Sequence, residues 1–214
     1  MITQFIKKYK HTQSTIDIPF NNINVVRIFT DGSCSKNGYS DAVGGFASII
    51  VSGYNRHNML FGMVEPKMLS TSISLPTQII KPTNIRAEGF AILNALNELH
   101  HDIDNADKWK EAIFYSDSEF WINMITKWMP TWPTSKFMSG ANPDLTISIR
   151  DMWNVVNEKK KVSIMHVYAH NKDMRASDDL FTKFTYHNND LADALAFIAR
   201  TLPDYNPQRL IITP

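Results

Sequence analysis

The distribution of apolar residues along the chain predicts five β-strands. β-branched and aromatic side chains gather in short runs, which is typical of strands that pack in a sheet. The first run leads into Asp31-Gly32, a pair that indicates a turn at the end of a strand. Short connections join the first three runs, so we expect these strands to form an antiparallel meander. The five runs cover residues 25–30, 44–51, 58–64, 112–115 and 161–168.

The hydrophobic period changes to that of a helix from Asn84 onward. Apolar side chains recur there every three or four residues, and Thr83 or Asn84 is suited to cap the first turn. The tetrapeptide Ser116-Asp117-Ser118-Glu119 has the Ser-x-x-Glu form of a capping box and predicts the start of a second helix. The apolar residues at helical spacing in the first helix are Ile85, Ile92, Leu96 and Leu99.

Prolines delimit the remaining helices. Pro130 and Pro133 are expected to end the second helix. Asn142-Pro143-Asp144 predicts the start of a third, with proline at the first helical position. A fourth helix is expected over about residues 188–200.

This order of elements predicts one α/β domain with a mixed sheet over residues 25–202. We expect residues 1–24 to be an N-terminal extension and residues 203–214 a C-terminal tail. Residues 65–82 are predicted to be an extended loop, because they contain Pro66, Pro76 and Pro82 and many Ser and Thr. Residues 171–187 are expected to form a second loop.

The composition excludes several classes of protein. With 43% hydrophobic and 20% charged residues, the 214-residue chain is neither disordered nor fibrous. No apolar run approaches the ~20 residues that a membrane span needs, so we expect no membrane contact. The single cysteine, Cys34, cannot form an internal disulfide, which favours a reducing compartment.

The first 24 residues bear on localisation. No apolar segment follows Lys7, Lys8 and Lys10, so a secretory signal peptide is not expected. A mitochondrial presequence is the weaker alternative, because this stretch contains no arginine. We therefore expect an intracellular protein, in the cytoplasm or the nucleus.

Four acidic residues stand at positions where a carboxylate is unusual. Asp31 ends the first strand, Asp117 follows the fourth, and Glu88 lies on the apolar face of the first helix. Asp193 lies within the last helix. Several buried carboxylates repel one another unless a cation binds them, and Mg²⁺ prefers such oxygen ligands. The pattern therefore suggests a metal site for phosphoryl chemistry.

Each of these acids also has a simpler interpretation. Asp31 and Asp117 could cap a turn and a helix, and Glu88 and Asp193 could face solvent. Asp193 has the weakest pattern, because Leu191, Leu195 and Ile198 define the opposite face of its helix. Spacing alone leaves these alternatives open.

Four segments resemble the motifs of type 1 ribonuclease H, in the same order along the chain. They are Ile28–Gly38, Thr83–Glu88, Ser116–Ser118 and Asn189–Ala196. The resemblance spans residues 25–200 and implies the RNase H-like fold. That fold is a five-stranded mixed sheet, three antiparallel strands followed by two parallel ones, flanked by helices.

The resemblance implies a monomeric endonuclease that hydrolyses the RNA strand of RNA–DNA hybrids and leaves 5′-phosphate and 3′-hydroxyl ends. Asp31, Glu88, Asp117 and Asp193 would bind two Mg²⁺ ions, for which Mn²⁺ could substitute. Further substrate contacts are implied at the matching positions of the motifs: Gly32, Ser33, Asn37, Asn84, Glu88, Ser118 and Asn189.

The family also has a flexible-loop histidine that assists product release. His170 matches it best, but Asn189 follows nineteen positions later, which is a long loop for this family. His187 is therefore an alternative.

Other residues match the positions with which the family binds the DNA strand. Trp128, Trp132 and Phe137 match its aromatic track, although the prolines between them also suit a packed hydrophobic corner. The lysines expected between the aromatics are absent. The family's phosphate pocket is matched by Lys81, Thr83 and Asn142, and Asn142 could instead serve only as a helix cap.

The charge balance adds one constraint. The chain has 22 Lys and Arg against 21 Asp and Glu, a formal charge of +1, so bulk electrostatics alone would not hold nucleic acid. If the four carboxylates bind metal, 17 other acids remain.

Two alternative functions stay open: another two-metal nuclease of the superfamily, such as an exonuclease or junction resolvase, and a non-catalytic module that binds hybrids.

Overall fold

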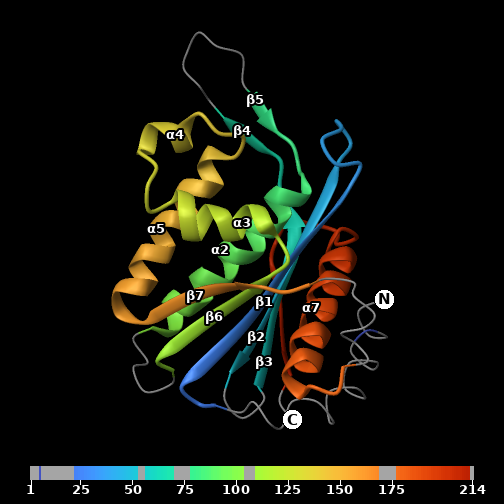
Figure 1. Cartoon of the computed structure of the whole chain (residues 1–214). Coiled ribbons are helices and arrows are strands. Elements are labelled where there is room, and N and C mark those ends of the chain that lie inside the picture. Colours follow the sequence, from blue (N-terminus) through green and yellow to red (C-terminus); the bar gives the residue numbers. More distant parts are fainter. Residues whose placement is uncertain are drawn as a thin grey trace.

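A central sheet with helices on both faces forms the core of the protein (Figure 1). The computed structural model describes residue 5 and residues 22–52, 56–69, 78–103, 109–168 and 177–212. In that part of the chain no helix is long and apolar enough to cross a membrane.

The main sheet has six strands in the order β7-β6-β1-β2-β3-β8. The first three strands of the chain pair antiparallel, whereas β1, β6 and β7 pair parallel. The five strands that the sequence predicts are therefore present with the predicted directions. The strands are β1 (Val25–Ser35), β2 (Val43–Ser52), β3 (Arg56–Val64), β6 (Glu111–Ser116), β7 (Lys161–His166) and β8 (Gln208–Ile212).

Alternate residues of β1 point into two separate cores. Ile28 packs in a cluster with residues of α2 (Asn84–Asp102) and α5 (Pro143–Lys159). Phe29 packs in a second cluster with α7 (Leu180–Ala199) on the other face. Because successive side chains of a strand face opposite sides, Asp31 falls on the α7 side and Gly32 on the α2 side. Asp31 therefore faces the α7 layer and Gly32 faces the α2 layer, although the two residues are adjacent in β1.

The second predicted helix starts later than its capping-box pattern indicates. Ser118, not Ser116, is the N-cap of α3 (Glu119–Asn123), and its side chain accepts a hydrogen bond from the Trp121 amide at 3.5 Å. Ser116 remains in β6, where it pairs with His166 of β7. The prediction of Ser116 as the cap was wrong, because strand pairing holds that residue.

The last helix starts earlier than predicted. Asp179 caps α7, and its carboxylate accepts a hydrogen bond from the Thr182 amide at 2.8 Å. The part of the predicted 171–187 loop from Leu180 onward is therefore helical. The predicted loop 65–82 likewise contains two short strands, β4 (Lys67–Leu69) and β5 (Gln78–Ile80), which pair with each other apart from the main sheet.

The sixth strand lies in the segment predicted as a C-terminal tail. β8 pairs antiparallel with the edge of β3. Arg209 of β8 forms an ion pair with Glu98 of α2, and Glu98 also accepts a hydrogen bond from Asn58 of β3 at 2.8 Å. An apolar run as short as this one does not distinguish a strand from a tail in the sequence.

We expect Leu210→Ala to lower the free energy of unfolding by about 1–2 kcal/mol, since this half-buried side chain packs against the α7-side core. Ile211→Ala is the matched control, because Ile211 lies on the opposite face of β8 and is 45% exposed. Urea denaturation of both variants measures the effect. Equal and negligible losses would show that β8 does not pack as described.

Candidate active site

Asp31 lies within β1, the strand that joins the antiparallel and parallel halves of the sheet. It comes two residues after Phe29, where the parallel pairing with β6 ends, and β1 continues beside β2 to Ser35. The turn predicted at Asp31-Gly32 is therefore wrong, because pairing with β2 keeps both residues in the strand.

Asp31 is only 6% exposed, and its Oδ1 accepts a hydrogen bond from the Gly32 amide at 2.6 Å. A Cβ at Gly32 would lie 2.2 Å from the Glu88 backbone nitrogen and 2.5 Å from the Ala87 carbonyl carbon. Only glycine allows β1 and α2 to approach so closely, and this approach brings Asp31 next to Glu88.

Glu88 and Asp117 are held together by the start of α3. Ser118 Oγ donates a hydrogen bond to Glu88 Oε2 at 2.5 Å and also caps α3. Asp117 directly follows β6, whose end lies beside β1 through the pairing of Phe29 with Tyr115. The N-terminal part of α2, the part of β1 just past its pairing with β6, and the carboxyl end of β6 thus place three carboxylates close together.

Asp193 approaches the same carboxylates from α7, on the other face of the sheet. A Cβ at Gly45 of β2 would lie 2.3 Å from the Ala196 carbonyl oxygen, so α7 rests directly on the sheet at this point. Asp193 is half-buried, and its charge acts on Asp31. The solvent-facing alternative for Asp193 is therefore not what the structure shows.

The electrostatics show that the four carboxylates form one group. Burial, and next the charges of Asp117 and Asp193, raise the pKa of Asp31 well above its usual value, with a further contribution from Glu88. Burial raises the pKa of Glu88 to about 7; the hydrogen bond from Ser118 opposes this shift, and the charge of Asp117 adds to it. The shifts thus arise from burial and like charges, each opposed by a single hydrogen bond.

This donor set fits a hard divalent cation. All four side chains supply carboxylate oxygens, and a cation would relieve the repulsion that raises the two pKa values. Within the described residues, no group of three or more His, Cys, Asp or Glu side chains is arranged to hold a metal ion as it stands.

We expect Ser118→Ala to raise the pKa of Glu88 above about 7, because the hydroxyl is the group that lowers it. The variant also loses the α3 cap, at a cost of about 1 kcal/mol in unfolding free energy. Carboxyl ¹³C shifts of the metal-free protein against pH measure the first effect. Ser118→Thr keeps a hydroxyl and should titrate like the wild type. An unchanged Glu88 titration in Ser118→Ala would contradict the contact.

Comparison with known proteins identifies the family of this chain. Residues 23–200 match the RNase H family. The chain belongs to the RNase H family. It is 28% identical over 163 residues to "Ribonuclease H" of Haemophilus influenzae, covering 74% of this chain and 88% of that one. It is also 27% identical over 147 residues to "Ribonuclease H" of Schizosaccharomyces pombe, covering 68% of this chain and 47% of that protein, so it spans about half of that relative's length.

Solved structures show the same fold at low sequence identity. LC9-RNase H1, described as a type 1 RNase H with the type 2 active-site motif, superposes with a TM-score of 0.55 at 18% identity, over 86% of this chain and 74% of that one. The prototype foamy virus protease-reverse transcriptase superposes with a TM-score of 0.56 at 16% identity, over 90% of this chain and 23% of that one. The RNase H-like fold expected from the motifs is thereby confirmed, with β8 as an additional strand.

For this RNase H family member, the predicted substrate residues near the carboxylates lie at the start of α2. Thr83 caps the helix, and its Oγ1 accepts a hydrogen bond from the Arg86 amide at 3.1 Å. Asn37 Oδ1 accepts a hydrogen bond from the Asn84 amide at 3.1 Å, which ties the turn after β1 to the helix. Gly32 and Ser33 lie within β1, where they pair with β2. Lys81, just before the helix, is exposed.

Arg86 is a residue that sequence reasoning missed. Its side chain is fully buried and binds Asp144 of α5 with both terminal nitrogens, at 3.1 and 2.8 Å. It also donates to Asn142 Oδ1 at 3.2 Å, and the Asn142 side chain caps no backbone amide. Asn142 is the N-cap residue of α5, as its pattern indicated, but its side chain binds Arg86 instead of a backbone amide of the helix. An arginine within an otherwise apolar helix face was the available signal, since buried arginines need acceptors.

Phe120 of α3 and the two tryptophans that follow α3 form a contiguous row of partly buried rings, which packs against the α2-side core. Trp128 and Trp132 stack with centroids 5.2 Å apart, and Phe120, which sequence reasoning also missed, contacts Trp128 at 5.7 Å. Phe137 is 2% exposed and belongs to the α2-side core. Its ring is therefore packed in a hydrophobic corner, which was the alternative to a DNA contact in the sequence analysis. Lys136 Nζ lies 4.1 Å from the Trp132 ring centroid. Lys136 stands between Trp132 and Phe137 in the sequence, so the expectation that no lysine lies between the aromatics was wrong.

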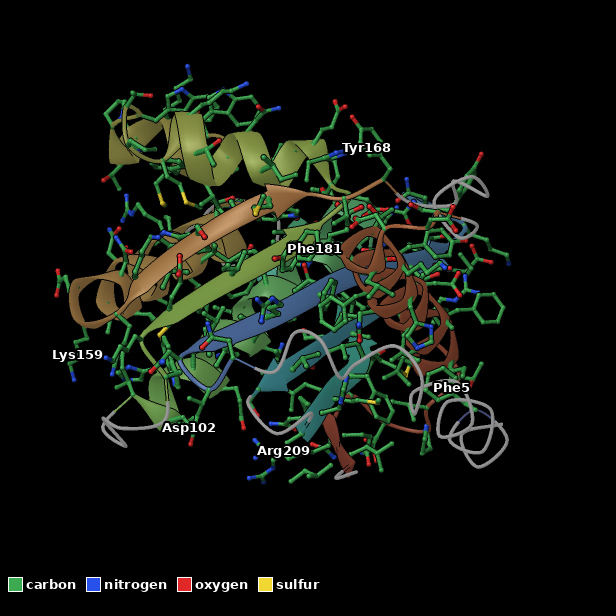
Figure 2. The ribbon with its side chains drawn as sticks, turned by 60° about the horizontal axis from the view of Figure 1, so that its bottom comes forward. Phe5, Asp102, Lys159, Tyr168, Phe181 and Arg209 are labelled. Atoms are coloured by element: carbon green, nitrogen blue, oxygen red, sulfur yellow. The ribbon has the colours of Figure 1, made fainter. Side chains whose placement is uncertain are left out.

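The two candidate histidines differ in what can be said of them. His170 lies outside the described residues. His187 lies within α7 and not in a loop, and burial lowers its pKa while the charge of Asp190 opposes that shift. Asn189, also on α7, is 3% exposed. At the end of β7, Figure 2 shows Tyr168, whose ring packs edge-on against His166 at 4.8 Å.

Proposed function

We propose that this protein is an endoribonuclease that hydrolyses the RNA strand of RNA–DNA hybrids with two bound Mg²⁺ ions. The observation that carries the proposal is the meeting of four carboxylates from β1, α2, the end of β6 and α7. Family membership supports a nuclease, and the two raised pKa values support a site that requires divalent cations.

Asp31, Glu88, Asp117 and Asp193 would hold the two ions. When bound, such ions activate a water molecule and stabilise the leaving 3′-oxygen of a phosphodiester. The chain's own contribution is to keep the carboxylates rigid: Gly32 packs β1 onto α2, and Ser118 orients Glu88. The products would be a 5′-phosphate and a 3′-hydroxyl.

Selection of the RNA strand would come from groups beside the carboxylates. Gly32, Ser33, Asn37 and Asn84 lie where β1 and the turn after it meet the start of α2. Backbone and amide groups there are suited to hydrogen-bond the 2′-hydroxyl that distinguishes RNA from DNA. His170 remains our proposal for the histidine that assists product release.

The DNA strand would lie along the row of Phe120, Trp128 and Trp132. Aromatic faces support bases and sugars, and Lys136 adds charge at the end of the row. Asn142, held by Arg86, together with Thr83 and Lys81 would bind a phosphate. All of these proposed contacts with the DNA strand come from one chain, so we propose that the enzyme acts as a monomer.

A panel of substrates tests the proposal. We expect the protein with Mg²⁺ to cut an RNA–DNA hybrid, and to leave double-stranded RNA, duplex DNA and a four-way DNA junction intact. Faster cleavage of duplex DNA or of the junction would favour an exonuclease or a resolvase. Binding of the hybrid without cleavage, in either Mg²⁺ or Mn²⁺, would favour a non-catalytic module.

A further inference from the structure

The helix that begins beside the active site contains a π-helical turn. α3 continues directly into η3 (Met124–Trp128), in which the Met129 amide donates to the Met124 carbonyl five residues earlier, at 2.8 Å. In Figure 2 these turns belong to the yellow-green helix along the top. π-helical turns are rare, and each acts as a one-residue insertion in an α-helix.

The sequence provides a cause for this turn. Pro130 has no amide hydrogen, and in a continuous α-helix its ring would clash with the carbonyl of Thr126. The buried side chains of Met124 and Ile125 hold the same segment against the core. The wider turn accommodates both constraints.

The start of α3 is fixed, so the π-helical turn sets the direction of the residues after it. Trp121 is fully buried, and its indole donates to the Ile85 carbonyl of α2 at 2.7 Å. A Cβ at Gly89 would lie 2.3 Å from the Trp121 ring, so α2 and α3 are in direct contact. Because α3 is held in place, a change in helical twist after α3 changes the direction of the Trp128 side chain.

The π-helical turn aligns Phe120 with Trp128. Eight α-helical residues would set these two side chains about 80° apart around the axis, whereas one inserted residue reduces the offset to about 20°. The observed ring contact at 5.7 Å agrees with the smaller offset. Trp132 then stacks on Trp128, and its amide donates to the Trp128 carbonyl at 2.8 Å.

We infer that the η3 turn is a positioning element that assembles Phe120, Trp128 and Trp132 into one continuous surface for the uncleaved strand. The inference rests on the proposed function, since it concerns how the hybrid lies across the site. Without the extra residue, Trp128 and Trp132 would rotate together away from Phe120 and the row would be broken beside the carboxylates.

A double-mutant cycle tests the alignment without changing the register. Phe120→Leu and Trp128→Leu should each raise KM for the hybrid at least ~5-fold while kcat changes less than ~2-fold. The double variant should be little worse than the more severe single variant, because the two rings act as one surface. Independent, multiplying effects on KM would overturn the inference.

Deletion of Thr126 tests the register itself. Thr126 is exposed, and its removal takes one residue out of the segment between Phe120 and Trp128, so Trp128 should turn away from Phe120 and KM should rise to that of Trp128→Leu. Thr126→Ala keeps all five residues and should retain the wild-type KM. Deletion of the exposed Lys127, with Lys127→Ala as its control, repeats the test on a second site, and thermal unfolding verifies that each variant is folded.

The outcomes separate the two proposals. If the wild type cuts hybrid but a folded deletion variant keeps the wild-type KM, the positioning role is wrong and the proposed function stands. If neither deletion variant folds, the double-mutant cycle decides the question. If the wild type neither binds nor cuts hybrid, both proposals fail.

Discussion

Replacing Asp31 by Asn is expected to reduce Mg²⁺-dependent hydrolysis of the hybrid by at least ~10³-fold, because the loss of a metal ligand removes several kcal/mol of transition-state stabilisation. The same change should raise the stability of the metal-free protein above neutral pH. Asp31 is buried beside Asp117 and Asp193, and the neutral amide removes that repulsion while still accepting the Gly32 hydrogen bond. Steady-state kinetics and urea denaturation in EDTA measure the two effects.

A matched control separates the site from a general loss of charge. Asp151→Asn removes a carboxylate on α5 that is 60% exposed and pairs only with its neighbour Arg150 among the contacts described. Its activity should stay within about twofold of wild type, since exposed pairs contribute little. An active Asp31→Asn variant, or one that is inactive because it is unfolded, would contradict the assignment.

The metal-free protein should lose stability as pH rises through the titration of Glu88. The folded pKa of about 7 lies above the unfolded value of 4.5. The protonated carboxyl therefore stabilises the fold fully below about pH 4.5, and this contribution is lost as pH rises past 7. From about pH 5 to about pH 8 the loss from Glu88 is about 2–3 kcal/mol, and Asp31 acts in the same direction.

Mg²⁺ should reverse this loss at the higher pH, because an ion that binds only the folded state adds to its stability. Denaturation curves at about pH 5 and about pH 8, with EDTA or with Mg²⁺, measure the change in the free energy of unfolding. Glu88→Gln isolates the residue: its metal-free stability should vary less with pH than that of the wild type, by about the same 2–3 kcal/mol. Parallel curves for the two proteins would show that Glu88 is not buried with raised pKa.

The sequence was sufficient to predict the elements with strong local patterns. The strands of the main sheet up to β7 follow from runs of β-branched residues, and Thr83 caps α2 as its pattern indicated. Asp31, Glu88 and Asp117 stood out because each follows or interrupts an apolar pattern. Asp193 had the weakest pattern of the four, since its helix presents the clear apolar face elsewhere, and the motif resemblance strengthened its assignment.

Features that depend on tertiary contacts were missed for physical reasons. Ser116 has the form of a cap, but pairing with His166 keeps it in a strand. The burial of Arg86 depends on Asp144, which is distant in the sequence. The η3 turn arises from a conflict between Pro130 and the buried Met124 and Ile125, which hydrophobic periodicity alone does not reveal. A local sequence pattern reflects contacts within one segment, whereas these features depend on contacts between segments that are distant in the sequence.

The most direct test of the central claim follows the RNA strand itself. An end-labelled RNA annealed to complementary DNA is incubated with the protein in Mg²⁺ and, in parallel, in EDTA. The four-carboxylate site predicts internal cuts in the RNA that carry 5′-phosphate and 3′-hydroxyl ends, an intact DNA strand, and no cleavage in EDTA. Cleavage that persists in EDTA, or that falls on the DNA strand, would contradict it.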